Sequence, residues 1–272
     1  PGDLLRLRKN GVNFKIAHDG MMAAHVLQLA SLGLKSNARE WLSADVKDFK
    51  DVFADGFEAT PEGIHYACSD ADWTLRTTMR LLEEVDKAGL RPVYDLGIKS
   101  MNLAVDMMEH GVLVDRKAVA ELDAYLREKI DEATTVFESA GGSVDAINSP
   151  TKLRKLLFED LKLPTALSHK NKTGWSTDKN VLAKLKGRHP IIEAITEYRK
   201  HHKTLSTYVE KLPNYIGEDG RVHTTLKVTG TETGRPSAEE PNLLNVPNRT
   251  EEGRKVRDCY VAARGYTLVS ID

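Results

Sequence analysis

One amphipathic run in the middle of the sequence constrains the fold more than any other feature. Between Asp115 and the pair Gly141-Gly142, the apolar residues recur every three or four positions: Val119, Leu122, Leu126, Ile130, Ala133 and Phe137. This spacing places them on one face of an α-helix, which Asp115 would cap and the glycines would end. A helix of roughly 25 residues is long for a globular domain. The chain is therefore expected to be largely helical.

Helical spacing and helix-boundary residues predict most of the other elements. The predicted helices are Met21–Leu32, Tyr66–Val85, Val93–His110, Thr177–Leu185 and Ile191–Leu212, with a further helix opened by Asn148-Ser149-Pro150. Leu167–Thr177, rich in Lys, Ser, Asn and Gly, predicts an exposed loop. After a turn at Gly217–Gly220, the β-forming residues of Val222–Val228 and Tyr266–Ile271 predict strands. The expected fold class is mixed α/β, mostly helical.

Length and composition describe an ordinary globular protein. The 272 residues exceed what one core usually supports, and 40% apolar with 29% charged residues is a typical balance. No apolar run reaches the roughly 20 residues that span a bilayer, and the first residues lack the apolar core of a secretory signal. Cys68 and Cys259 stand far apart, so we expect reduced thiols and a cytosolic setting.

The net charge of −1 conceals an uneven distribution. Residues 151–212 contain 14 Lys or Arg against 6 Asp or Glu. A basic block inside a nearly neutral protein favours a surface that contacts phosphate groups. A solvated helix face is the alternative that charge alone leaves open.

The C-terminal segment, Thr229–Asp272, carries the most specific motifs. Thr231-Glu-Thr-Gly-Arg235 combines a glycine, which lets the backbone approach a ligand, with an arginine whose planar fork of donors can reach it. P-N-L-L-N-V-P follows at 241–247, and V-S-I-D ends on Asp272. A carboxylate at the end of an apolar strand is a natural ligand for Mg²⁺.

These motifs resemble the start of the palm of family A DNA polymerases, the DNA polymerase I family, and E-Y-R-x-x-x-K-x-x-S-T-Y at 197–208 resembles the family's thumb. The resemblance implies phosphate contacts from the helix and minor-groove contacts at the primer terminus from the palm. The implied DNA-binding residues are Arg199, Lys203, Arg235, Asn242, Asn245, Arg249 and Arg254. Leu244 and Pro236-Ser237-Ala238 depart from the family's usual Gln and Leu-Ser-Ser.

By the same resemblance, Asp272 is a catalytic residue and metal ligand that bridges two Mg²⁺ ions during nucleotidyl transfer. Its partner aspartate, the fingers and the remaining palm strands follow this position in the family. We therefore expect the 272-residue chain to be unable to polymerise by itself.

Tyr66 and Asp70 are four residues apart on a predicted helix, so their side chains share one face. With Asp3 in D-L-L-x-L-x-x-N-G, they resemble the last two elements of the 3′–5′ proofreading exonuclease domain, which has an RNase H-like fold. Asp3 and Asp70 would be metal ligands and Tyr66 a catalytic residue that orients water. Gly2 replaces the family's usual aromatic residue, and the D-x-E strand is expected before residue 1. Asp19 is interpreted as a structural residue or a helix cap.

The implied function is DNA-directed DNA polymerase with an exonuclease-like domain, acting in replication and repair. The expected domains are 1–88 (partial exonuclease), 89–212 (start of the polymerase domain and thumb) and 213–272 (first part of an antiparallel-sheet palm). The implied partners are primer-template DNA, deoxynucleoside triphosphates and the remainder of the polymerase. No membrane partner is expected. The alternatives are an RNase D-type exonuclease and a non-catalytic duplex-binding fragment. The expected location is the cytoplasm of a bacterium or phage-infected cell, with an organelle as the alternative.

Overall fold

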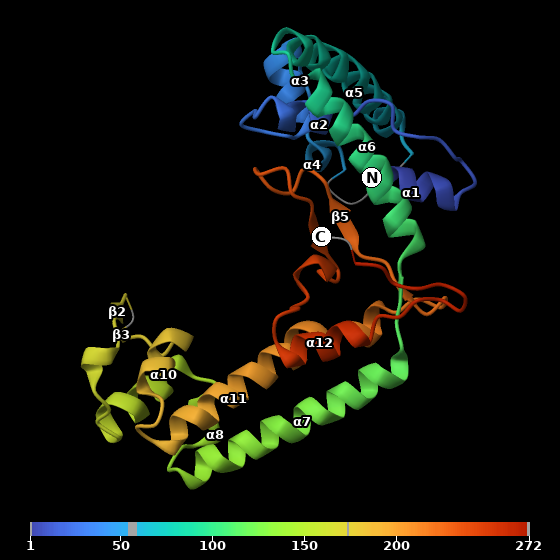
Figure 1. Cartoon of the computed structure of the whole chain (residues 1–272). Coiled ribbons are helices and arrows are strands. Elements are labelled where there is room, and N and C mark those ends of the chain that lie inside the picture. The colour runs from blue at the N-terminus through green and yellow to red at the C-terminus, as the bar shows by residue number, and fades with distance from the viewer. Residues whose placement is uncertain (1, 54–58, 173, 271–272) are drawn as a thin grey trace. The chain divides into compact units, whose positions relative to one another are not determined.

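A computed structural model describes residues 2–53, 59–172 and 174–270 (Figure 1). The chain divides into two compact units, each built from segments distant in sequence. The first unit comprises Pro1–Gly111 and His223–Leu244, and the second comprises Val112–Val222 and Asn245–Asp272. The three predicted domains do not follow this division, and their boundaries stay a prediction.

The first unit is a helical cluster with one small sheet. Its helices are α1 (Gly2–Lys9), α2 (Gly20–Val26), α3 (Leu34–Leu42), α4 (Phe49–Val52), α5 (Pro61–Lys87) and α6 (Arg91–His110). Strands β5 (Thr225–Lys227) and β6 (Ser237–Glu239) pair antiparallel, with Leu226 opposite Ala238. The sheet packs on α6, where the Leu226 amide donates to Sδ of Met108. Met22, Leu81, Val85 and Tyr94 are among the buried residues of the helical core.

Local signals explain where these helices begin and end. Oδ1 of Asp19 accepts a bond of 2.7 Å from the Met22 amide, which confirms Asp19 as a cap of α2. The predicted helix Met21–Leu32 ends early, at Val26, because Gln28 adopts a φ of 55° that an α-helix cannot contain. The predicted helix Tyr66–Val85 is part of the longer α5, which Thr60 caps and Pro61 begins.

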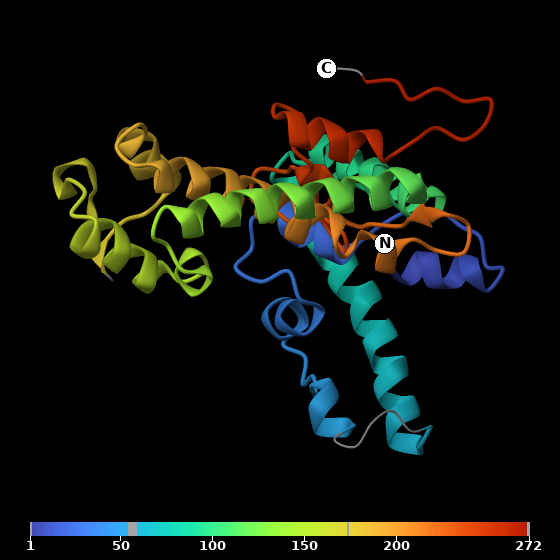
Figure 2. The same ribbon diagram turned by 90° about the horizontal axis from the view of Figure 1, so that it is seen from below.

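The second unit is built around two long helices that lie side by side in Figures 1 and 2, α7 (Arg116–Ser139) and α11 (Pro190–Thr204). Its other helical elements are α8 (Val144–Ile147), α9 (Pro150–Lys155), α10 (Lys179–Leu185), α12 (Glu251–Asp258), the short turns η1 (Leu156–Asp160), η2 (Thr165–Leu167), η3 (Leu205–Val209) and η4 (Leu212–Tyr215). Strand β1 (Val112–Leu113) pairs with β4 (Arg221–Val222), and β2 (Lys170–Asn171) pairs with β3 (Gly174–Trp175). A further turn, η5, spans Leu243–Asn245.

The amphipathic run forms α7 as predicted. Oδ1 of Asp115 accepts bonds from the amides of Lys117 and Ala118, at 2.9 and 3.1 Å. The apolar stripe is buried except at Ile130, which is partly buried. Gly142 follows the helix because a Cβ there would lie 2.2 Å from the Phe137 ring. Thus one stretch of sequence determines both the helix and its boundary.

Three further predicted elements differ in part from the structure. The predicted helix Ile191–Leu212 widens into a π-helical turn at Leu205–Val209, and Leu167–Thr177 contains the β2–β3 hairpin. Val222–Val228 is divided between β4 and β5, which belong to different units.

The predicted strand at Tyr266–Ile271 is wrong for its described part, Tyr266–Ser270, which has no strand assignment. A strand needs a neighbour for its backbone hydrogen bonds, and no described strand pairs with this segment. Figure 2 shows the chain after α12 leaving that helix in an extended path. The side chains of Tyr266 and Val269 are 79% and 77% exposed.

The overall class is mixed α/β and mostly helical, as predicted. Cys68 is exposed, Cys259 is buried, and both are free thiols. Within the described residues, no helix combines the length and apolar character needed to cross a membrane.

Candidate nucleic-acid interface

Arg199 and Lys203, predicted as equivalent cations on α11, have different surroundings. Lys203 is exposed. Arg199 is half-buried and donates to the backbone oxygen of Thr177 and, at 3.4 Å, to Oγ1 of Thr177. Burial lowers the pKa of Arg199, and the nearby charge of Asp178 opposes that shift. Of these two cations, therefore, only Lys203 presents its charge to solvent.

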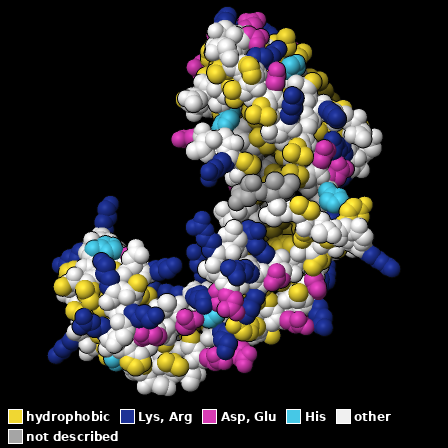
Figure 3. Space-filling view, in the orientation of Figure 1, with side chains coloured by type: hydrophobic (Ala, Val, Ile, Leu, Met, Phe, Trp, Pro, Cys, Tyr) yellow, Lys and Arg dark blue, Asp and Glu magenta, His cyan; other side chains and the backbone are white. Residues whose placement is uncertain are grey.

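The end of the second unit formed by α8 to α10 and the β2–β3 hairpin carries many exposed cations, visible as dark-blue side chains in Figure 3. Among the described residues, the following have no carboxylate within ion-pair distance: Lys155, Lys162, Lys170, Lys172, Lys179, Lys184, Lys186 and Arg188. Nζ of Lys170 lies 4.9 Å from the centre of the Trp175 ring. A surface of this kind attracts a polyanion without reading base sequence.

Two side chains hold the P-N-L-L-N-V-P loop from outside it. The Tyr208 hydroxyl donates to the backbone oxygen of Asn245 at 2.9 Å. Arg257 donates to the backbone oxygens of Val246 and Pro247 at 3.2 and 3.3 Å. Sequence reasoning placed Tyr208 in a family motif without giving it a role, and no local signal pointed to Arg257. The loop backbone is therefore held by groups of α12 and η3.

Helix α12 is attached to α11 through a buried carboxylate. Glu252 is 4% exposed, and its Oε1 lies 2.7 Å from Nζ of Lys200. Burial, the largest single cause, would raise the pKa of Glu252, but the hydrogen bond from Lys200, a backbone hydrogen bond and the nearby charges of Lys200 and His201 together lower the pKa overall. On the same helix, Nζ of Lys255 lies 3.9 Å from the centre of the Tyr125 ring of α7. Arg254, carried by this anchored helix, and Arg249, which precedes it, are both exposed.

The T-E-T-G-R motif lies in the first unit, in the connection from β5 to β6. Gly234 has a φ of +74°, and Oγ1 of Thr231 donates to the backbone oxygen of Arg235 at 2.7 Å. Arg235 is exposed, as is Asn242 beyond β6. The tight turn therefore presents the arginine on a constrained backbone. Asn245 and the remaining predicted DNA-binding residues belong to the second unit.

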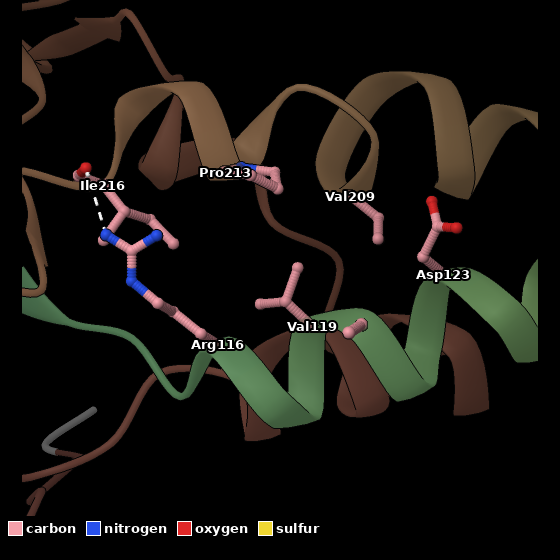
Figure 4. A pocket seen from close by; sticks show the side chains of 7 residues that line it. Arg116, Val119, Asp123, Val209, Pro213 and Ile216 are labelled. Atoms are coloured by element: carbon pink, nitrogen blue, oxygen red, sulfur yellow. Dashed lines mark hydrogen bonds between the residues drawn. The ribbon is translucent and has the colours of Figure 1, made fainter.

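The pocket in Figure 4 lies within the second unit, between α7 and the segment η3–η4. It has a volume of about 290 Å³, and Val119, Val209, Pro213 and Ile216 line its apolar wall. At its edges, Arg116 donates to the backbone oxygen of Ile216 at 3.5 Å. Asp123 at the edge pairs with Arg127 at 2.7 Å. Both edge charges are therefore engaged within the protein.

Tyr66 and Asp70 share a face of α5, as predicted, and both contact Lys35 of α3. Nζ of Lys35 lies 2.7 Å from the Tyr66 hydroxyl, 2.6 Å from Oδ1 of Asp70 and 2.8 Å from the backbone oxygen of Lys47. An ammonium group has three donors, so all three are used. Burial, the largest single cause, lowers the pKa of Lys35, but the hydrogen bonds and charge interactions with Asp70 and Tyr66 together raise the pKa overall. Sequence reasoning missed Lys35 because only the fold brings it to this pair.

The structure describes two of the three metal ligands predicted from the sequence, Asp3 and Asp70. Asp3 lies exposed near the start of α1, and Asp272 falls outside the described residues. Throughout the described ranges, no group of three or more His, Cys, Asp or Glu could hold a metal ion. The carboxylate of Asp70 accepts a hydrogen bond from the Lys35 ammonium group. The metal-ligand roles of Asp3, Asp70 and Asp272 therefore stay predictions.

Comparison with known proteins places these features in a family. The sequence model of DNA polymerase family A matches residues 116–272. DNA polymerase I of Treponema pallidum (strain Nichols) is 34% identical over 261 residues, covering 93% of this chain and 26% of that protein. DNA polymerase I of Rhizobium leguminosarum is 32% identical over 283 residues, covering 99% of this chain and 28% of that protein. The chain thus spans about a quarter of the length of these relatives.

A solved structure shows the same fold. It is described as the POL domain of Pol1 from M. smegmatis in complex with DNA primer-template and dNTP. The TM-score is 0.77 at 28% identity, covering 92% of this chain and 42% of that one. The family match includes α7, the basic helical region and the P-N-L-L-N loop. The chain belongs to DNA polymerase family A.

Proposed function

We propose that this chain supplies the DNA-holding part of a DNA-directed DNA polymerase, which adds deoxynucleotides to a primer 3′ end. The main support for this proposal is a set of exposed cations on helices of the second unit that are fixed by tertiary contacts. Lys203 stands on α11, while Arg249 and Arg254 border or belong to α12, which Lys200 and Tyr125 hold. Charged groups on fixed helices suit the regularly spaced phosphates of a duplex.

Arg235, Asn242 and Asn245 are proposed to contact the minor groove near the primer terminus. Acceptors there are common to all correct base pairs, so contacts to them sense pair shape and not base identity. The constrained turn at Gly234 and the bond from Tyr208 to the Asn245 backbone support this role, because both limit the movement of the contacting residues. The structure of the M. smegmatis relative, described as containing DNA primer-template and dNTP, supports DNA and nucleotide as partners.

Mg²⁺ is the proposed cofactor of nucleotidyl transfer, with Asp272 as one ligand. The ion would supply Lewis-acid stabilisation of the developing charge on the phosphoryl oxygens. The domain assignment 1–88, 89–212 and 213–272, and the exonuclease roles of Asp3, Tyr66 and Asp70, are part of the same proposal. We also propose that the fingers and the remaining palm are partners of this chain and that the protein is located in the cytoplasm. No observation favours an RNase D-type exonuclease.

DNA binding by charge variants tests the proposal. The double variant K203Q/R254Q should bind a fluorescent primer-template duplex at least about tenfold more weakly than the parent chain, because two phosphate contacts are lost. The matched control is Lys117→Gln, which removes an 86% exposed cation that pairs with Glu121 on α7. Fluorescence anisotropy at fixed salt measures both. Equal affinity of the double variant and the control would refute the proposed interface.

A further inference from the structure

Two arginines from different helices hold the backbone that leads out of the β2–β3 hairpin. Nε of Arg154, on α9, donates to the backbone oxygen of Trp175 at 2.8 Å. Arg199, on α11, donates to both the backbone oxygen and the hydroxyl of Thr177. Trp175 ends β3, and Thr177 directly precedes Asp178, the cap of α10. The two guanidinium groups therefore tie the exit of the hairpin to α9 and α11.

The hairpin depends on such support. Its strands contain two residues each, and an isolated two-stranded hairpin is at best marginally stable in water. Arg154 also lies against the start of β3, since a Cβ on Gly174 would be 3.1 Å from Cδ of Arg154. The hairpin presents the exposed side chains of Lys170 and Lys172. The two arginines therefore add to the contacts that fix the position of these lysines.

Arg199 is poorly placed to contact a phosphate itself. It is half-buried, and each of its two terminal nitrogens donates one hydrogen bond to an oxygen of Thr177. Turning the guanidinium away to reach DNA would break these bonds and leave the partly buried Thr177 carbonyl without its charged donor. Lys203, one helical turn further along α11, is exposed. The same helix thus carries one cation that faces solvent and one that faces the protein.

We propose that Arg199 is a positioning residue: it serves DNA binding by fixing the hairpin that presents Lys170 and Lys172, and it does not contact phosphate directly. The proposal rests on the proposed DNA-binding function. The planar guanidinium is required because it reaches two oxygens of Thr177 at once. A lysine there would keep the charge but would lose this two-point hold.

A double-mutant cycle on DNA affinity separates positioning from direct contact. Arg199→Lys and the pair K170Q/K172Q should each weaken binding of a primer-template duplex by roughly tenfold. Their combination should be no weaker than K170Q/K172Q alone, because Arg199 acts through these lysines. Lys203→Gln, the control, should add its full effect to K170Q/K172Q. Full additivity of Arg199→Lys, or near-parental affinity of this charge-preserving variant, would overturn the proposal.

Hydrogen exchange at the amides of 169–177, measured without DNA, tests the same inference independently. Arg199→Lys should speed exchange in this segment by about tenfold or more, whereas Lys203→Gln should leave it unchanged. Unchanged exchange in Arg199→Lys would show that Arg199 does not fix the hairpin, even if DNA affinity fell. If no variant altered DNA affinity while exchange in Arg199→Lys still rose, the proposed DNA-binding function would be wrong, but Arg199 would still fix the hairpin. The two failures are thus distinguishable.

Discussion

Lys35 uses all three donors of its ammonium group on partners from two separate parts of the chain. The Tyr66 hydroxyl and the Asp70 carboxylate come from α5, and the third acceptor is the backbone oxygen of Lys47. The Lys35 side chain is 21% exposed and that of Asp70 is 33% exposed, so solvent screens their attraction only partly. One lysine therefore connects α3 both to α5 and to the segment that precedes α4.

Replacing Lys35 by Met should lower the free energy of unfolding by about 1–2 kcal/mol. The variant removes three hydrogen bonds and leaves Asp70 and Tyr66 partly buried without their donor. Lys47→Met is the control, because Nζ of Lys47 pairs with Glu62 where both side chains are 65% exposed. Its effect should stay below about 0.5 kcal/mol. Urea denaturation followed by circular dichroism measures both, and equal losses would contradict the assigned role of Lys35.

Among the elements, α12 shows how a short helix becomes a fixed platform. Eight residues are too few to form a stable helix in isolation. Thr250 caps the helix by accepting from the Gly253 amide, Glu252 pairs with Lys200, and Lys255 lies over Tyr125. Gly253 also packs tightly, because a Cβ there would lie 2.6 Å from Pro247. Tertiary contacts therefore account for the stability of this helix, and Arg254 inherits a fixed position from them.

The Lys200–Glu252 pair should make stability depend on pH. The pKa of Glu252 is lowered in the folded state from an ordinary value of 4.5, so its contribution is present above pH 4.5 and is lost as the pH falls through the folded-state pKa. Glu252→Gln should be less stable than the parent near neutral pH, by about 1 kcal/mol, and the difference should shrink in acid. Thermal unfolding between pH 3 and pH 7 measures this.

Glu251→Gln is the matched control for that series. Glu251 precedes Glu252 on α12 and pairs with Lys255, but its side chain is 75% exposed. Its substitution should leave the acid profile parallel to that of the parent. If Glu252→Gln also runs parallel to the parent down to pH 3, the ion pair does not contribute to stability.

At the scale of the whole molecule, charge is unevenly spread. The net charge is −1, yet the basic side chains of 151–212 include many that have no acidic partner in the described part of the chain. Local potential, and not net charge, determines how a polyanion approaches. A nearly neutral protein can therefore bind DNA through one of its surfaces.

Binding of duplex DNA should fall steeply with salt and depend little on sequence. Each phosphate contact contributes a slope of about −0.9 in log affinity against log salt concentration. Two duplexes of unrelated sequence should bind with affinities within about twofold of each other, because backbone contacts carry no base information. Anisotropy titrations at several salt concentrations provide the measurement. A strong preference for one duplex, or a flat salt response, would exclude this mode of binding.

Much of the local structure could be predicted from the sequence. The caps at Asp19 and Asp115, the apolar stripe of α7 and the shared face of Tyr66 and Asp70 depend on neighbours within one or two helical turns. The motifs that identified the family are equally local. Errors arose where distant segments decide the outcome, as at Tyr266–Ser270, where a strand would need a partner that no local pattern specifies.

The sequence by itself determined the long amphipathic helices, the caps at Asp19 and Asp115, the basic block and the polymerase family, because each depends on residue types at fixed short spacings. Only the tertiary structure decided which cations are available. Arg199 and Lys203 are four residues apart on one helix, yet Arg199 is held by Thr177 while Lys203 is exposed. Likewise, Lys35 and Arg257 acquired their partners through folding. Burial and hydrogen bonding between distant segments set the role of a charged side chain, and helical spacing does not contain that information.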